Sequence, residues 1–278
     1  MKIASWNVNS LNVRLPHLLR WLDSFQPDVV ALQETKLEDP KFPDAALAEL
    51  GYRSVFCGQK TYNGVALVSR LPFHGECICA IPGFEDAQKR VLAASIHDPG
   101  SGQEQIEPTQ ALRIIDLYVV NGEAVGSAKF DYKLRWLAAV RAWLGEEIRR
   151  YPNLVVLGDF NIAPEDRDVH DPKRWRDKLL CSTQEREALQ SLLALGLHDS
   201  FRLFHPETGQ YSWWDYRLAA FARGWGLRID LVLVSDALRG RCTAGGIEIE
   251  TRGWERPSDH APVWVDIADG QSLLGAYR

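Results

Sequence analysis

The chain has 278 residues, of which 46% are hydrophobic and 25% charged, as in an ordinary globular protein with a sizeable core. Its net charge of −5 lacks the basic excess of many nucleic-acid binders, but it does not exclude a metal-dependent nuclease, which carries carboxylates of its own. No secretory segment or membrane span is apparent, and five cysteines without framework spacing are typical of structural thiols in a reducing compartment. We therefore expect a cytoplasmic monomer with no membrane contact.

Strand-like and helix-like segments alternate along the chain without a long linker or a repeat, which predicts one domain. The first unit reads as a strand over residues 2–8, a helix over about 15–24 and a strand over 28–33. Between residues 52 and 118, short extended runs are separated by Gly and Pro turn signals, a pattern typical of an antiparallel meander. Residues 98–110 lack periodicity and are predicted to form a surface hairpin loop.

The sequence of the second half of the chain predicts two helices and, after them, two strands. A long helix over about 129–150 carries apolar side chains three to four positions apart. The next helix begins at Ser182-Thr183-Gln184-Glu185, which has the spacing of a capping box, and Gly196 suits its end. Strands follow over 228–234 and 261–267. Because strands and helices mix and no Gly-rich phosphate loop of the Walker or Rossmann type is present, we predict an α/β sandwich.

Polar side chains stand where several apolar strands end or begin. The run at residues 154–157 leads into Gly158-Asp159-Phe160-Asn161, where strand alternation makes Asp159 and Asn161 point together and Phe160 point into the core. The corresponding polar residues of other strands are Asn7, Asn9, Glu34, Asp230 and His260. This arrangement predicts an active site at the edge of a sheet, built from residues far apart in the sequence.

The types of these residues indicate metal-assisted chemistry. Glu34 and Asp259, with the amides of Asn7 and Asn9, offer oxygen ligands and no thiolate, a set that favours Mg²⁺, or Mn²⁺ in its place, over zinc. Any one of these side chains could be a solvated charge, but together with the other strand-end residues they indicate a site.

His260 stands beside a carboxylate that we do not expect it to contact. Adjacent residues of an extended chain point apart, so Asp230 is the better partner than Asp259. Such a carboxylate fixes the imidazole tautomer and favours the imidazolium, which can touch a phosphoryl oxygen. A serine hydrolase is disfavoured, because Ser258 lies two residues before His260 and no Gly-x-Ser-x-Gly elbow occurs.

Seven blocks of sequence together resemble one family, and they cover the chain from residue 2 to about 267. The blocks are Trp6-Asn7-Val8-Asn9, Gln33-Glu34-Thr35-Lys36, Tyr62-Asn63-Gly64-Val65-Ala66, Gly158-Asp159-Phe160-Asn161-Ile162-Ala163-Pro164, Trp214-Asp215-Tyr216-Arg217, Arg228-Ile229-Asp230 and Pro257-Ser258-Asp259-His260-Ala261-Pro262. In this order they are similar to the exonuclease III group of apurinic/apyrimidinic endonucleases. The resemblance implies a DNase I-like fold, a four-layer sandwich of two packed mixed β-sheets flanked by helices, in a single domain over residues 1–278. It also implies hydrolysis of phosphate esters in DNA repair.

The resemblance assigns a role to each matching residue. Glu34 would be the main metal ligand, supported by Asp259, Asn7 and Asn9. Asp159 would orient or deprotonate the attacking water with Asn161 beside it, the pair of Asp230 and His260 would hold the scissile phosphate, and the hydroxyl of Tyr118 would face that phosphate. This sequence departs from the family at Asn9, where an acidic residue is common, and at Val120, where proline is usual.

Several further residues are candidates for contact with DNA. The basic residues could bind backbone phosphates or be solvated surface charges, and of two adjacent tryptophans on an extended segment one is expected in the core and one at a lesion. These candidates are Arg14, Lys36, Asn121, Lys129, Trp213, Trp214 and Arg217.

The leading hypothesis is a Mg²⁺-dependent DNA repair nuclease acting on duplex DNA with abasic sites or with damaged or recessed 3′ ends. Its expected activities are 3′-5′ exonuclease, 3′-phosphatase or phosphodiesterase, and abasic-site endonuclease. A narrower hypothesis is an enzyme that acts at 3′ ends only. Within the family the resemblance implies that the loops, and not the catalytic residues, decide between cleavage at abasic sites and action at 3′ ends.

Two hypotheses of other functional classes are less favoured. A phosphoinositide or sphingomyelin hydrolase would share the fold, but Gln33-Glu34-Thr35-Lys36 and Trp214-Asp215-Tyr216-Arg217 are typical of the DNA-cleaving branch. A non-catalytic DNA-binding module is disfavoured because the catalytic set is complete.

Overall fold

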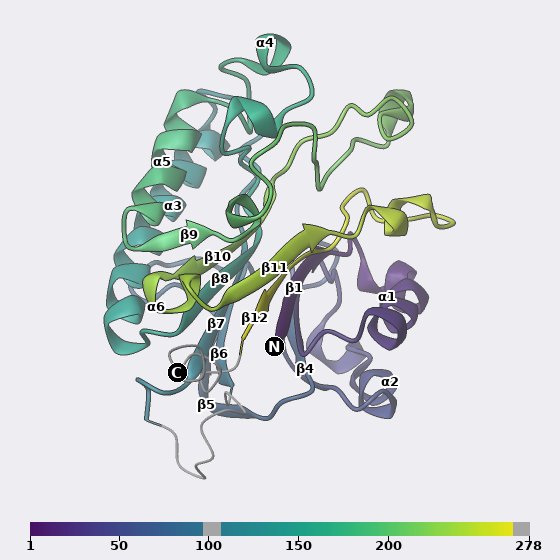
Figure 1. Ribbon diagram of the computed structural model, residues 1–278, viewed down its shortest axis with the longest axis vertical. Helices are drawn as coiled ribbons and strands as arrows, with labels where there is room; N and C mark the ends of the chain where they lie inside the picture. The colour runs from purple at the N-terminus through teal and green to yellow at the C-terminus, as the bar shows by residue number, and fades with distance from the viewer. Residues whose placement is uncertain (97–106, 269–278) are drawn as a thin grey trace, which may run out of the picture.

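A computed structural model describes residues 1–96 and 107–268 of the chain, and two six-stranded mixed sheets pack face to face within them (Figure 1). The strands of the first sheet, in spatial order, are β11 (Cys242–Ile247), β12 (Val263–Ile267), β1 (Lys2–Asn7), β2 (Val29–Gln33), β4 (Val65–Ser69) and β3 (Arg53–Cys57). Those of the second are β5 (Phe73–Ile78), β6 (Val91–Ile96), β7 (Leu112–Tyr118), β8 (Leu154–Asp159), β10 (Asp230–Ser235) and β9 (Leu197–Asp199).

Each sheet contains one parallel pair of strands, which in each case is joined through a helix. β1 and β2 are connected by α1 (Leu11–Phe25), and β7 and β8 are connected by α3 (Ala128–Arg150). Parallel neighbours need such a crossover, whereas the antiparallel pairs can be joined by shorter loops. The carboxyl ends of β1, β2, β7 and β8 therefore meet along one rim of the sandwich.

One of the large hydrophobic cores lies between the two sheets. Its buried side chains include Ile3 and Val29 from the first sheet and Ile114, Val155 and Val232 from the second. Because one face of each sheet packs on the other sheet and the opposite face packs on helices, the central strands are buried on both faces and read as continuous apolar runs.

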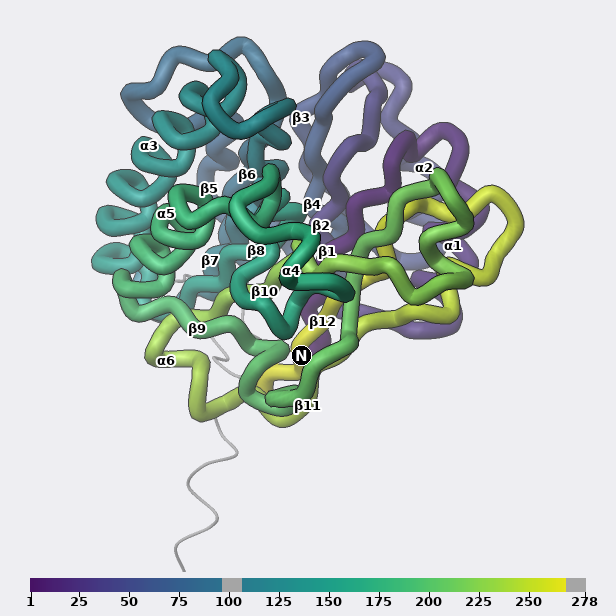
Figure 2. The backbone as a smooth tube through the Cα atoms, turned by 90° about the horizontal axis from the view of Figure 1, so that it is seen from above, coloured from purple at the N-terminus to yellow at the C-terminus, as the bar shows by residue number. Residues whose placement is uncertain are grey.

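Helices form the two outer layers. The helices α3 and α5 (Thr183–Leu193) cover the second sheet, while α1 and α2 (Asp44–Glu49) cover the first, as the view from above also shows (Figure 2). The four-layer DNase I-like prediction is therefore confirmed. The remaining helical elements are α4 (Pro172–Trp175), α6 (Asp236–Arg239) and 3-10 turns at Asp39–Lys41, Asp166–Asp168, Phe201–Leu203, Arg217–Ala219 and Ile249–Gly253.

The capping box predicted before α5 is present. The Ser182 hydroxyl accepts from the Glu185 backbone N–H at 3.3 Å, and the Glu185 carboxylate accepts from the Ser182 N–H at 3.1 Å. The long helix begins at Ala128, one residue before the predicted position, and α1 begins at Leu11, four residues earlier than predicted.

The antiparallel meander predicted between residues 52 and 118 is divided between the two sheets. β3 and β4 pair in the first sheet and β5, β6 and β7 in the second, because the chain crosses over near Leu71-Pro72. Most of the predicted 98–110 loop lies outside the described residues. The strand β11 was not predicted, since Gly245 and Gly246 weaken its strand signal.

Two expectations from the composition can be compared with the structure. The described part of the chain contains no helix that is long and apolar enough to cross a membrane. The expectation that all cysteines are free thiols is wrong, because Cys57 and Cys79 form a disulfide with a Cα–Cα distance of 6.2 Å. Cys77, Cys181 and Cys242 are free thiols.

Candidate active site

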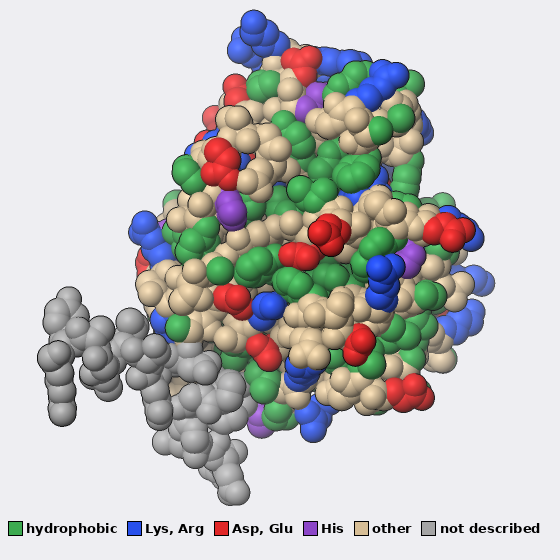
Figure 3. Space-filling model, turned by 45° about the vertical axis from the view of Figure 1, so that its right-hand side comes forward, with side chains coloured by type: hydrophobic (Ala, Val, Ile, Leu, Met, Phe, Trp, Pro, Cys, Tyr) green, Lys and Arg blue, Asp and Glu red, His purple; other side chains and the backbone are tan. Residues whose placement is uncertain are grey.

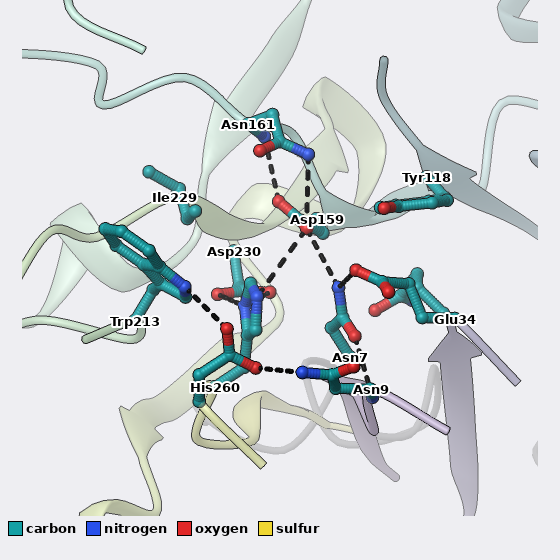
Figure 4. Close-up of polar contacts among 12 residues, drawn as sticks. Asn7, Asn9, Glu34, Tyr118, Asp159, Asn161, Trp213, Ile229, Asp230 and His260 are labelled. Carbon is teal, nitrogen blue, oxygen red and sulfur yellow. Dashed lines mark hydrogen bonds and ion pairs between the residues drawn. The ribbon is translucent and has the colours of Figure 1, made fainter. Parts of the chain in front are cut away.

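The polar residues predicted at strand ends converge on the rim where the two sheets meet (Figure 4). Tyr118 and Asp159 are register partners at the carboxyl ends of the parallel strands β7 and β8, and Asp230 opposes Asp159 at the start of the antiparallel strand β10. The first sheet contributes Asn7 at the end of β1 and Glu34 directly after β2. Together with His260, these residues come from six distant stretches and form one cluster.

Backbone conformation shapes this rim. Gly158 has φ +143°, and a Cβ at this position would lie 1.9 Å from the Leu117 carbonyl oxygen. Only glycine lets β8 approach β7 so closely just before Asp159. Glu34 and Asn161 have positive φ values of 53° and 49°, which are uncommon for residues with a side chain and are found at functional sites.

Asp159 lies at the centre of the cluster and is 1% exposed. Its carboxylate accepts from the Asn161 backbone N–H at 2.9 Å, from the Asn161 side-chain amide at 3.3 Å and from the Asn7 amide at 3.0 Å. Burial raises the pKa of Asp159 to about 7, with the charge of His260 opposing this shift. A carboxylate with a pKa near neutrality can accept a proton from water.

His260 contacts Asp230, as the sequence predicted. Its Nδ1 lies 3.0 and 2.9 Å from the two Asp230 oxygens, and its Nε2 faces the Asp159 carboxylate at 3.8 Å. Burial alone would lower the pKa of His260, but the charges of Asp230 and Asp159 outweigh it and raise the pKa to about 10. The ring is therefore an imidazolium at neutral pH.

Glu34 is held by two neighbours on the first-sheet side of the cleft. Its carboxylate accepts from the Asn7 amide at 3.0 Å and pairs with Lys36 at 2.8 Å. Burial raises the pKa of Glu34, but Lys36 and the Asn7 hydrogen bond outweigh it and lower the pKa below its usual value. The carboxylate is therefore ionised and can bind a cation.

The two asparagines of the predicted ligand set contact the carboxylates. Asn7 donates to both Glu34 and Asp159, and its own oxygen accepts the Asn9 backbone N–H at 3.0 Å. Asn9 donates to Asp259 at 2.8 Å and accepts from Lys36 at 2.6 Å. In this geometry Asn7 and Asn9 orient Glu34 and Asp259.

Tyr118 faces the cleft from β7. Burial, followed by the charges of Glu34 and Asp159, raises the pKa of Tyr118 well above its usual value. The Arg90 guanidinium covers its ring at 4.6 Å from the centroid. The hydroxyl therefore remains protonated and can donate to an anionic oxygen.

The cluster also offers a group of side chains that could hold a metal ion in place of the proton on His260. The ligand atoms of Asp159, Asp230 and His260 all lie within 4.8 Å of one another, and all three residues are buried. This carboxylate and imidazole group is consistent with the metal ion of the family that the sequence resembles.

Some predicted DNA contacts lie elsewhere than expected. Arg14 donates to the carbonyls of Asn9 and Pro257 at 2.6 and 3.1 Å, so it links two loops of the site. Lys36 pairs with Glu34, which lines the cleft, and hydrogen-bonds to Asn9. Trp214 is 3% exposed and packs in the interior, which is not compatible with direct DNA contact.

Four other predicted contacts remain at the cleft or beside it. Trp213 is half-buried and donates to Asp259 at 3.0 Å, and Arg217 is exposed at the cleft mouth. Asn121 donates to the Asn161 side chain at 3.0 Å. Lys129 is exposed and pairs with Glu123 at 3.2 Å, in a neighbouring cavity that Glu34 and Tyr118 also line.

Two supporting residues were not predicted. The Ser212 hydroxyl donates to Asp230 at 2.7 Å, and nothing in its local sequence marks it. Lys133 is fully buried and donates to the backbone carbonyls of Asn161 and Asn121 at 2.7 and 3.2 Å. The sequence does mark Lys133, because it is a charged residue within the apolar stripe of α3.

Known proteins share both the sequence and the fold of this chain. Residues 4–260 match the Endonuclease/Exonuclease/phosphatase family. The exodeoxyribonuclease III of Haemophilus influenzae is 36% identical over 279 residues, which cover 96% of this chain and 100% of that protein.

Two solved structures extend the comparison. The 3′-5′ exonuclease NExo of Neisseria meningitidis is 48% identical, with a TM-score of 0.89 over 96% of this chain and 100% of its own. NExo from Neisseria is also described as a 3′ phosphatase, in a structure bound to product DNA hairpin. An AP endonuclease from Archaeoglobus fulgidus is 34% identical, with a TM-score of 0.86 over 96% of this chain and 99% of its own. This chain is therefore a DNA-repair phosphodiesterase that belongs to the exonuclease III and AP endonuclease branch of the endonuclease/exonuclease/phosphatase family.

Proposed function

We propose that this enzyme is a Mg²⁺-dependent nuclease that processes the 3′ ends of duplex DNA, as a 3′-5′ exonuclease and a 3′-phosphatase or phosphodiesterase. The observation that carries the proposal is the cleft of about 530 Å³ lined by Tyr118, Asp159 and His260, which opens beside Trp213 and Arg217. The 48% identity to a protein described both as a 3′-5′ exonuclease and as a 3′ phosphatase supports this choice. Abasic-site cleavage is the second candidate, supported by the 34% identity to an AP endonuclease.

The oxygen donors at the first-sheet side of the cleft fit a magnesium ion. Glu34 is ionised and offers the main ligand, with Asp259, Asn7 and Asn9 next to it in a chain of hydrogen bonds. His260 is a weaker candidate ligand, because its ring is protonated and bound to Asp230. Mg²⁺ or Mn²⁺ bound at Glu34 would withdraw charge from the phosphate.

The residues of the chain divide the hydrolysis between them. Asp159 takes a proton from the attacking water, and Asn161 holds that carboxylate in place through two hydrogen bonds. The His260 imidazolium and the Tyr118 hydroxyl donate to phosphoryl oxygens on which negative charge develops. Asp230 keeps the imidazole protonated and oriented. No covalent bond between enzyme and substrate is needed.

Labelled duplexes test this function directly. One carries a 3′ phosphate, one a recessed 3′ end and one an abasic analogue, and each is incubated with Mg²⁺ and with EDTA. We expect both 3′-end substrates to be processed only when Mg²⁺ is present. Equal products in EDTA would contradict the metal requirement, and cleavage of the 3′-modified ends alone would exclude the abasic endonuclease.

The role of Asp159 is tested by one substitution. Asp159→Asn keeps the side-chain size but cannot accept the proton from water, so turnover should fall by about two orders of magnitude or more. Single-turnover rates measured at saturating enzyme separate this loss from weaker DNA binding. A variant with unchanged turnover would show that another group acts on the water.

A further inference from the structure

A second cavity, of about 640 Å³, lies next to the catalytic cleft. Its lining comes from the segment around α4 and from the segment over residues 213–225. Both segments reach beyond the strand ends of the sheets (Figure 1). The cavity and the cleft share four lining residues, Trp175, Trp213, Asp215 and Arg217. Because Trp213 is fixed by its hydrogen bond to Asp259, it forms a fixed wall that the two spaces have in common.

Aromatic rings line this cavity. The ring of His170 lies 6.2 Å from that of Trp225 at an interplanar angle of 19° and 6.2 Å from that of Trp175 at 78°. His170 Nδ1 lies 3.2 Å from the Gly226 carbonyl oxygen, and the Arg223 guanidinium packs on the Trp225 ring at 4.6 Å. The three rings are half-buried, so they are held in place while part of each remains accessible.

Cations surround the mouth of the cavity. Arg174, Lys178 and Arg217 line it and are exposed, so the three cations outnumber the carboxylate of Asp215, which also lines it. Lys and Arg side chains also gather on the surface at the end of the molecule that carries α4 (Figure 3). A cavity with aromatic walls and a cationic rim suits a flat apolar ring attached to phosphates, which describes a nucleobase in a DNA strand.

The proposed 3′-end activities need different amounts of space. Removing a 3′ phosphate requires room for the phosphate alone, whereas removing a 3′ nucleotide requires a place for its base as well. The cavity adjoins the catalytic cleft through the lining residues that the two have in common, so it is the nearest additional space for such a base. We propose that this space, the base pocket lined by His170, Trp175 and Trp225, receives the unpaired base of the 3′-terminal nucleotide during exonuclease action. The inference rests on the proposed function and names the part of the substrate that the site recognises.

A consequence for substrate choice follows. A base enters the base pocket only after it leaves its partner strand, and leaving is less costly for a mismatched base than for a paired one. The enzyme should therefore remove a mismatched 3′ nucleotide faster than a paired one, and this preference should depend on the aromatic wall.

Trp225→Leu tests the base pocket. The variant is compared with the wild type for kcat/KM on a duplex with a mismatched 3′ nucleotide and on the same duplex ending in a 3′ phosphate. Loss of stacking should lower the ratio of nucleotide to phosphate removal by about tenfold, and Trp225→Phe should restore most of it. Trp264→Leu removes another half-buried tryptophan, on β12 and outside both cavities, and should leave the ratio unchanged.

A binding measurement tests the same contact without catalysis. Asp159→Asn protein should bind a duplex with a mismatched 3′ base about tenfold more tightly than one whose 3′ nucleotide lacks its base, and Trp225→Leu should remove this difference. If Trp225→Leu lowers both activities equally, or neither, the base pocket is refuted. A wild-type protein that removes a 3′ phosphate but no nucleotide refutes the base pocket alone, whereas one that removes neither refutes the proposed function as well.

Discussion

Lys133→Met is expected to destabilise the protein and to slow it, because Lys133 joins a helix to the catalytic loops. Its ammonium group is fully buried and pairs with the fully buried carboxylate of Glu185. It also donates to the backbone carbonyls of Asn161 at 2.7 Å and Asn121 at 3.2 Å. Methionine fills a similar volume but donates no hydrogen bond, so two carbonyls and one carboxylate each lose a partner.

The expected loss of stability depends on the hydrogen bonds that Glu185 keeps in the variant. Removing one partner of a buried ion pair costs about 3–5 kcal/mol. Glu185 keeps the Ser182 hydroxyl at 2.6 Å and the backbone N–H groups of Ser182 and Leu180 at 3.1 Å each, so the lower end, about 3 kcal/mol, is expected. Turnover should also fall by about tenfold, because Asn161 holds Asp159 through two hydrogen bonds.

Urea unfolding and single-turnover kinetics measure the two effects. The double variant Lys133→Met, Glu185→Gln removes both buried charges and should be about 2 kcal/mol more stable than the sum of the single losses predicts. Kinetics are measured at a temperature where the variant is fully folded, as judged by circular dichroism. A loss of stability below about 1 kcal/mol together with unchanged turnover would refute the reasoning.

Two further predictions concern the interior of the sandwich. Burial raises the pKa of Asp116 well above its usual value, so the folded protein keeps a proton that the unfolded chain loses as pH rises through about 4. Wild-type stability should therefore fall relative to Asp116→Asn by up to about 1.4 kcal/mol per pH unit above that point, and urea unfolding at pH 5 and pH 7 would contradict this if the gap stayed constant. Gly158→Ala would place a Cβ 1.9 Å from the Leu117 carbonyl oxygen, so we expect β7 and β8 to separate, with a loss of about 3 kcal/mol and of activity through displacement of Asp159. A variant with wild-type melting temperature and turnover would show that the sheet absorbs the methyl group.

Strand-end patterns in the sequence predicted where the site residues lie. Strand alternation predicted that Asp159 and Asn161 point together and that Asp259 and His260 point apart. Asp159 and Asn161 are in contact, although β8 ends at Asp159 and Asn161 has a left-handed backbone conformation. Asp230 was predicted as the partner of His260 on these grounds, and the two side chains are in contact. Local rules sufficed here because each inference concerned one strand and its immediate neighbours.

Other features depend on contacts that no local pattern encodes. Ser212 reaches Asp230 because its backbone N–H bonds to the Leu227 carbonyl, and a serine in a loop carries no periodic signal. The sequence predicted that one of Trp213 and Trp214 is buried and the other exposed, but not which one. Strand alternation shows that two adjacent side chains point to opposite faces, but it does not show which face is the inner one. The aromatic wall of the base pocket joins residues 170 and 225, which lie in two irregular segments.

The Asn7 side chain spans the seam of the molecule, touching Glu34 of one sheet and Asp159 of the other with a single amide group. Hydrolysis therefore depends on the correct alignment of the two sheets, although each sheet could form its own backbone hydrogen bonds. During refolding, the β-sheet signal should accordingly return before the enzymatic release of phosphate from a 3′ end. Recovery of activity during refolding thus reports the docking of the two sheets onto each other.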